Sequence, residues 1–159
     1  MKKFLLIALV SCLAMFFVSP TLSFETIFVP LPSYKIIVPK TDLPNEVKAF
    51  SGKWSGKWWY PGNYFDLDAV LIVEKIINES QATVVYGWGD NSRWKIRRGW
   101  KRRTVNLLRD EKNRLFFFLP LVESRLEFHL IGNELEGICR GLCDRNNGEG
   151  KTFISMKQK

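Results

Sequence analysis

The sequence predicts an all-β domain: a small antiparallel up-and-down barrel of about eight strands. After Gly52, short runs rich in β-branched and aromatic residues alternate with turn residues at fairly even intervals. No window beyond the first residues sustains the 3.6-residue apolar period of a helix. A meander of strands that closes on itself is then the natural way to protect its edges.

The predicted strands follow one another as hairpins. The clearest covers 124–131, where Leu126, Phe128 and Leu130 alternate with polar side chains, which puts His129 on the outer, wet face. Turn residues at 78–80, 110–113, 132–133 and 146–148 mark tight reversals. The eight predicted strands are 53–60, 68–77, 81–88, 101–109, 113–119, 124–131, 134–140 and 151–157.

The first residues are typical of an export signal. Residues 1–23 combine a charged start with an apolar run over 4–18 that is too short to span a bilayer comfortably. Small polar residues before Phe24 favour cleavage at that point, so we expect a secreted or periplasmic protein. Two alternatives stay open: a lipoprotein, because Leu9–Cys12 resembles a bacterial lipobox with Cys12 lipidated, and an anchor formed by an uncleaved leader.

Two further regions follow the leader. Residues 24–44 hold four prolines that interrupt every apolar cluster, so we expect an extended tether or edge segment and no helix. Residues 45–159 form the predicted barrel domain. At its start, 44–50 fits one helical turn, with Pro44 in the first turn and Phe50 pointing inward.

One segment carries the charge imbalance of the chain. Without residues 1–23 the formal charge falls from +8 to +6, and residues 93–103 alone contain seven basic residues and no acid. Aromatic rings interleave with these cations, a composition that suits anionic lipid headgroups, lipopolysaccharide or acidic glycans. The candidate polyanion-binding residues are Arg93, Trp94, Lys95, Arg97, Arg98, Trp100, Lys101, Arg102 and Arg103.

A structural interpretation of the same segment stays open. Acids from neighbouring strands, such as Glu74 and Glu127, would partly neutralise the cations, and Trp88 and Trp100 would serve as core tryptophans.

Among the cysteines, Cys139 and Cys143 form an even pair beyond the leader, and in an oxidising compartment they predict a disulfide.

The sequence offers no constellation for catalysis, so we expect no enzyme, no cofactor and no metal. His129 is the only histidine and no G-x-S-x-G elbow accompanies it. Asp66 and Asp68 point the same way but lack a third ligand. Paired carboxylates within 124–131 and 134–140 leave glycoside hydrolysis open as a minor alternative.

Phe50-Ser51-Gly52-Lys53-Trp54, with a short helix before it and consecutive strands after it, resembles the G-x-W opening of lipocalins and other calycins, and of small exported bacterial barrels. The resemblance implies that Trp54 packs at the closed end of the barrel and that a basic residue of the last strand, Lys157, lies across it. Gly52, Trp54 and Trp58 are the barrel-motif residues. A second lipocalin motif of the T-D-Y type is absent.

These features are compatible with three functions. The first is a non-enzymatic exported module that binds an anionic envelope component through 93–103. The second is a small carrier of an apolar ligand inside the barrel, and the third is a structural or protein-interaction domain that uses 24–44. We do not expect a nucleic acid partner. An interior filled by Phe116, Phe118, Leu126 and Phe128 would exclude the carrier, and an open apolar mouth would favour it.

Overall fold

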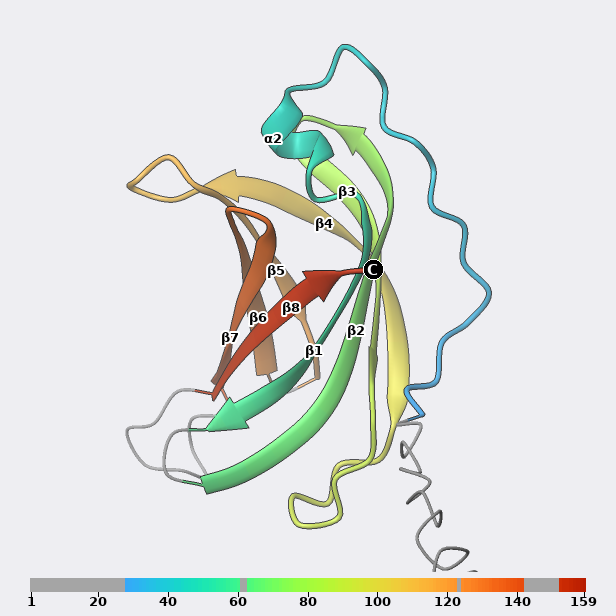
Figure 1. The fold of residues 1–159 in the computed structure, drawn as a ribbon, viewed down its shortest axis with the longest axis vertical. Helices are drawn as coiled ribbons and strands as arrows, with labels where there is room; N and C mark the ends of the chain where they lie inside the picture. Colours follow the sequence, from blue (N-terminus) through green and yellow to red (C-terminus); the bar gives the residue numbers. More distant parts are fainter. Residues whose placement is uncertain (1–27, 61–62, 123, 142–151) are drawn as a thin grey trace, which may run out of the picture.

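The computed structural model describes residues 28–60, 63–122, 124–141 and 152–159. It is a closed barrel of eight strands in which every neighbour is antiparallel and β8 pairs with β1 (Figure 1). The strands are β1 Gly52–Tyr60, β2 Asn63–Asn78, β3 Gln81–Trp88, β4 Gly99–Arg109, β5 Leu115–Pro120, β6 Ser124–Ile131, β7 Glu134–Gly141 and β8 Thr152–Gln158. The predicted fold class is confirmed, and each predicted strand lies within a few residues of an observed one. The predicted leader, residues 1–23, lies outside the described residues, and no described helix is long and apolar enough to cross a bilayer.

Alternation along each strand builds the core. On β6, Leu126 and Phe128 are buried inside the barrel, while Arg125 and Glu127 lie on the outer face, as the two-residue period requires. On β5 the alternation is Leu115, Phe117 and Leu119 inward, with Phe116 and Phe118 outward. The condition that would exclude a carrier, an interior filled by Phe116 and Phe118, is therefore not met at these two positions: the register places Phe117 there.

A short helix closes one end of the barrel. Helix α2, Asn45–Lys48, follows Pro44 and lies over that end (Figure 1). Val47 and Phe50 are buried in the core, and the indole Nε1 of Trp54 donates a hydrogen bond to the carbonyl of Phe50 at 2.9 Å. The expected helical turn and the closed-end position of the G-x-W tryptophan are both present.

The expectation for Lys157 is wrong. Register pairs Trp54 with Gln158, so Lys157 falls on the outer face, where it is mostly exposed and lies 3.9 Å from Glu134. Gln158 instead donates from Nε2 to the carbonyl of Ser51, which fixes the end of β8 against the start of β1.

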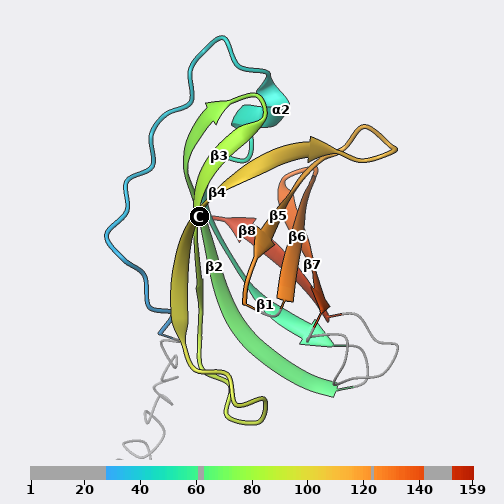
Figure 2. The same ribbon diagram turned by 180° about the vertical axis from the view of Figure 1, so that it is seen from behind.

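Residues 28–40, here called the strap, run along the outside of β2, β3 and β4 without forming a strand (Figures 1 and 2). Glu74 occupies a bulge of β2, so its carbonyl is available to accept the amide of Ile37 at 2.7 Å. Gly87 of β3 allows a close approach, because a Cβ there would lie 2.9 Å or less from atoms of three strap residues. The outer-face residues Ile72 and Val85, paired between these contacts, are fully buried. The strap thus gives the barrel a second, smaller apolar layer.

Pairing between β4 and β5 is short. Only three residue pairs join them, at Leu107–Arg109 of β4, so the earlier part of β4 has no ladder on that side. Register against β3 places Lys101 and Arg103 on the inner face of this part of β4. The two strands therefore splay apart toward the end of the barrel opposite α2.

Candidate functional site

A cavity of about 310 Å³ occupies the end of the barrel opposite α2. Its volume lies at the lower end of the ~300–1,000 Å³ typical of ligand pockets. It exists because Phe116 and Phe118 point outward, while the large inward ring Phe117 packs against Phe50 nearer the closed end. The described residues that line it are Trp58, Leu67, Tyr86, Trp88, Ile96, Lys101, Leu121, Val122, Ser124, Leu126, Cys139 and Thr152.

The polar atoms deep in this cavity are already satisfied. The indole of Trp58 donates from Nε1 to the hydroxyl of Tyr86 at 2.7 Å, and the Tyr86 ring stacks on Trp88 at 5.8 Å. Burial raises the pKa of Tyr86 far above its ordinary value, so the hydroxyl stays neutral. The inner part of the cavity therefore offers an apolar surface to a ligand.

Lys101 is the only charged residue among the described lining residues. It lies opposite Tyr86 on the inner face of β4, and no described residue forms an ion pair with it. Sequence reasoning included Lys101 in a surface patch, but alternation turns it toward the interior. A cation at the mouth of an apolar cavity attracts the anionic end of an otherwise apolar molecule.

The predicted basic segment is divided among three locations. Arg93, Lys95, Arg97 and Arg98 are exposed in the β3–β4 loop beside the cavity mouth. Pairing of Asn91 with Ile96 tightens this loop, with Lys95 in the left-handed region at φ 54°.

Side-chain contacts hold the loop to its surroundings. Asp90 accepts the amide of Arg98 at 2.9 Å, and the Arg98 guanidinium lies over the Phe28 ring at 5.2 Å. Trp94, half-buried, donates its amide to Asn91 at 3.0 Å. The loop is thus a built turn that presents cations at its surface.

Arg102 faces the strap. Its Nε and Nη2 atoms donate to Glu74 at 2.8 and 3.0 Å, and Nη2 also donates to the Ser33 carbonyl at 2.7 Å. The Glu74 side chain is only 12% exposed, against 42% for Arg102. Glu74 was named as one of the neutralising acids, and for Arg102 this structural interpretation describes what the geometry shows. Arg103, next along, is on the inner face and exposed, so these neighbours do not form one patch.

The two tryptophans assigned to the core differ. Trp88 packs against the core cluster and donates from Nε1 to the Arg97 carbonyl at 2.8 Å, so it joins the loop to the barrel. Trp100 lies on the outer face of β4 and is 44% exposed, which is not a core position.

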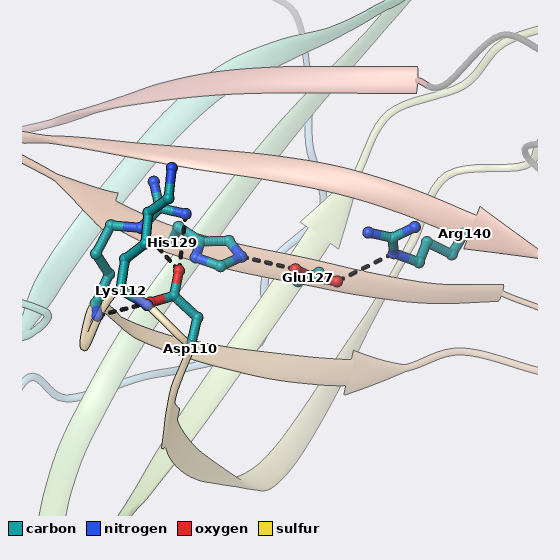
Figure 3. A network of polar contacts seen from close by, with 6 residues as sticks. Asp110, Lys112, Glu127, His129 and Arg140 are labelled. Carbon is teal, nitrogen blue, oxygen red and sulfur yellow. Dashed lines mark hydrogen bonds and ion pairs between the residues drawn. The ribbon is translucent and has the colours of Figure 1, made fainter.

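A second hollow, of about 840 Å³, lies on the outer face between the β4–β5 turn and strands β6, β7 and β8. Figure 3 shows Glu127 between His129 and Arg140: the carboxylate accepts from Nε2 of His129 at 2.7 Å and from Nε of Arg140 at 3.1 Å. Burial alone would raise the pKa of the Glu127 carboxyl, but these two hydrogen bonds outweigh it and hold that pKa below its ordinary value.

His129 was expected to be solvated. It does lie on the outer face, but its side chain is 13% exposed, because the ring stacks on Phe116 at 5.0 Å and the β4–β5 turn lies beside it (Figure 3). Strand alternation predicts the face of a residue and not what covers that face.

Among the described residues, His129 and Ser155 are engaged by different carboxylates. Ser155, two strands away on β8, donates its hydroxyl to Glu134 at 2.6 Å, and His129 is engaged by Glu127. The lowered pKa of the Glu127 carboxyl differs from the raised pKa that the general acid of a glycoside hydrolase needs.

Two further sequence predictions concern metal ligands and a disulfide. Within the described ranges, no three His, Cys, Asp or Glu side chains gather as metal ligands, and Asp66 and Asp68 lie 3.0 and 3.8 Å from Lys57 instead. Cys139 is buried at the cavity wall, and its predicted partner Cys143 lies outside the described residues.

Sequence reasoning left open whether the barrel contains a cavity, and the structure shows one. Its wall comes from inward residues at the ends of β1, β3, β5 and β7 and at the starts of the strands that follow them, all at one end of the barrel.

In comparisons with family models, curated proteins and solved structures, the chain matches none. Its closed antiparallel barrel is compatible with the calycin architecture that the G-x-W resemblance implies.

Proposed function

We propose that this chain is an exported, non-enzymatic carrier of an anionic amphiphile, a molecule with an apolar tail and a negatively charged headgroup. The tail occupies the barrel cavity, and the headgroup meets Lys101 at its mouth. The observation that carries the proposal is the apolar cavity of about 310 Å³ with a single cation among its described lining residues.

The chemistry of the cavity supports an apolar tail. Trp58, Tyr86, Trp88 and Leu126 supply aromatic and aliphatic surface, and the indole N–H of Trp58 is already bonded to the Tyr86 hydroxyl at 2.7 Å. Each methylene moved from water into such a surface contributes about 0.8 kcal/mol. A short or medium acyl chain suits a volume near the lower end of the ligand-pocket range.

Lys101 supports an anionic headgroup. Among the described lining residues its ammonium is the one charge, and a carboxylate or phosphate beside it gains a charge-assisted hydrogen bond.

The leader-like residues 1–23 support export of the protein, with lipidation at Cys12 or an uncleaved anchor as alternatives.

Calorimetric titration with decanoic acid tests the proposal. The wild-type chain should bind decanoic acid. Leu126→Trp, which fills the cavity, should abolish binding while the chain still melts cooperatively. Absence of decanoic acid binding to the folded wild-type chain would refute the carrier.

Lys101→Met tests how much the charged headgroup contributes to binding. It should weaken decanoic acid by about tenfold, or ~1.4 kcal/mol, and leave decanol unchanged. Lys53→Met is the matched control, since Lys53 lies outside the cavity on β1. Equal losses for the acid and the alcohol would show that Lys101 acts through packing.

A second candidate function is engagement of an anionic envelope surface by the β3–β4 loop. The observation that favours it is that Arg93, Lys95, Arg97 and Arg98 are exposed together at one end of the barrel. Replacing Arg93, Lys95 and Arg97 by Ser should lower retention on anionic liposomes and on heparin, and salt should elute the wild-type chain. Arg102 is left intact because it holds the strap. Unchanged retention would end this hypothesis.

A further inference from the structure

We infer that the outer hollow between β6, β7, β8 and the end of β1 is a binding site for a neutral oligosaccharide. The site is separate from the barrel cavity and uses different side chains. Its elements are an exposed aromatic pair, a hydrogen-bond donor on one side and an acceptor on the other.

The aromatic pair is Trp59 and Phe153. They face each other across the β1–β8 ladder with ring centroids 5.3 Å apart, and Trp59 is 49% exposed although it is one of the largest apolar side chains. The faces of such rings carry partial negative charge, and the C–H groups on the flat face of a pyranose carry partial positive charge. An exposed indole that lines a hollow therefore suits a stacked sugar ring.

The polar groups lie on β7, next to this pair. Glu136, Ile138 and Arg140 occupy alternate positions on its outer face, and Ile138 lies directly opposite Phe153. At about 3.4 Å per residue, Glu136 and Arg140 are roughly 14 Å apart along the strand. A ligand stacked over the middle of this row reaches an acceptor at one end and a donor at the other.

Arg140 is held in place as a donor. Only its Nε is engaged by a described residue, the carboxylate of Glu127, and Glu127 is in turn fixed by His129 (Figure 3). The terminal N–H groups of Arg140 remain for ligand oxygens. Glu136 is exposed, and within the described part of the chain no hydrogen bond or ion pair engages its carboxylate.

Charge favours a neutral ligand over a polyanion. Lining cations and anions are equal in number, and several are already paired: Arg140 with Glu127, Arg114 with Asp110, and Arg109 with Glu46 outside the hollow. Such a surface has little net field to attract a charged polymer. Hydroxyl groups, which donate and accept, match one free carboxylate and one fixed guanidinium.

The test is titration of the full chain with cellotetraose, maltotetraose and chitotetraose, followed by intrinsic tryptophan fluorescence and calorimetry. At least one tetrasaccharide should bind at millimolar concentration. Trp59→Ala should weaken that binding by about tenfold or more (~1.4 kcal/mol). Trp100→Ala is the matched control, because Trp100 is similarly exposed but lies on β4, outside the hollow; it should change affinity by less than about twofold.

Arg140→Met gives a second, independent variant. It should weaken the same oligosaccharide while decanoic acid binding in the barrel is unchanged, and thermal melts should show that all three variants are folded. The inference is overturned if no tetrasaccharide binds, if Trp59→Ala binds as the wild type does, or if both tryptophan variants lose affinity equally.

Discussion

Replacing Arg102 by Met tests whether one ion pair fixes the strap to the barrel. The substitution removes two hydrogen bonds to Glu74, at 2.8 and 3.0 Å, and one to the Ser33 carbonyl at 2.7 Å. It leaves the Glu74 carboxylate, 12% exposed, without a partner. Removing one partner of a buried pair costs ~3–5 kcal/mol. Because the Arg102 side chain is 42% exposed, water can reach part of the vacated site, and we expect about 2–3 kcal/mol.

Chemical and thermal denaturation of a double-mutant cycle would measure this effect. For a domain of this size each kcal/mol lowers Tm by roughly 3–5 °C, so Arg102→Met should melt about 6–15 °C below the wild type. Glu74→Met combined with Arg102→Met should recover most of the loss, because no unpaired charge remains.

Hydrogen exchange adds a local measurement. The amide of Ile37 donates to the Glu74 carbonyl, so its protection should fall in Arg102→Met more than that of the barrel amides. A loss of stability below about 0.5 kcal/mol, or a double variant no more stable than the single one, would refute the reasoning.

Three further predictions concern the barrel. Gly56→Ala should destabilise the chain by about 1–3 kcal/mol or more, since its Cβ would lie 2.2 Å from a backbone carbonyl oxygen of β8, whereas Gly89→Ala, with its nearest contact at 3.7 Å, should be tolerated; urea denaturation compares them. The folded-state pKa of Glu127 is lowered, so its contribution to stability is present above about pH 4.3 and is lost as pH falls through the folded value. Glu127→Gln should therefore be less stable than the wild type at neutral pH. A difference in stability between the two that does not disappear in acid would contradict this. Trp58→Phe should cost about 1–3 kcal/mol by leaving the Tyr86 hydroxyl without its donor, and Tyr86→Phe in the same chain should relieve part of that cost in thermal melts.

Strand periodicity predicted most of the fold. Alternation of Leu126 and Phe128 with polar residues gave the correct inner face of β6. The turn residues at 78–80, 110–113 and 132–133 gave the correct hairpins, and the turn predicted at 146–148 lies outside the described residues. Periodicity was silent at Phe116–Phe118, where every residue is apolar, because either register buries a phenylalanine. On the last strand, the predicted partner of Trp54 was wrong by one residue: Gln158, not Lys157, pairs with Trp54. A shift of one residue exchanges the two faces of a strand.

The candidate sites depended on contacts that no local pattern contains. Ile72 and Val85 lie in stretches of β2 and β3 that are apolar on both faces. The sequence alone therefore does not show that the strap covers the outer face there. The basic segment 93–103 reads as one block of charge, yet a turn and a strand divide it among the loop, the strap contact and the interior. Composition gave its charge correctly, and only three-dimensional pairing shows which cations are engaged.

The strap begins beside the mouth of the barrel cavity, which affects how a ligand would reach the cavity. Phe28 is held by Arg98 beside the cavity mouth, so the polypeptide joins its domain at the opening and not at the end covered by α2 (Figure 2). Any tether upstream of Phe28, whether a retained leader or a lipid on Cys12, would keep that opening within reach of the bilayer that holds it. An amphiphile would then pass between membrane and barrel over a short path.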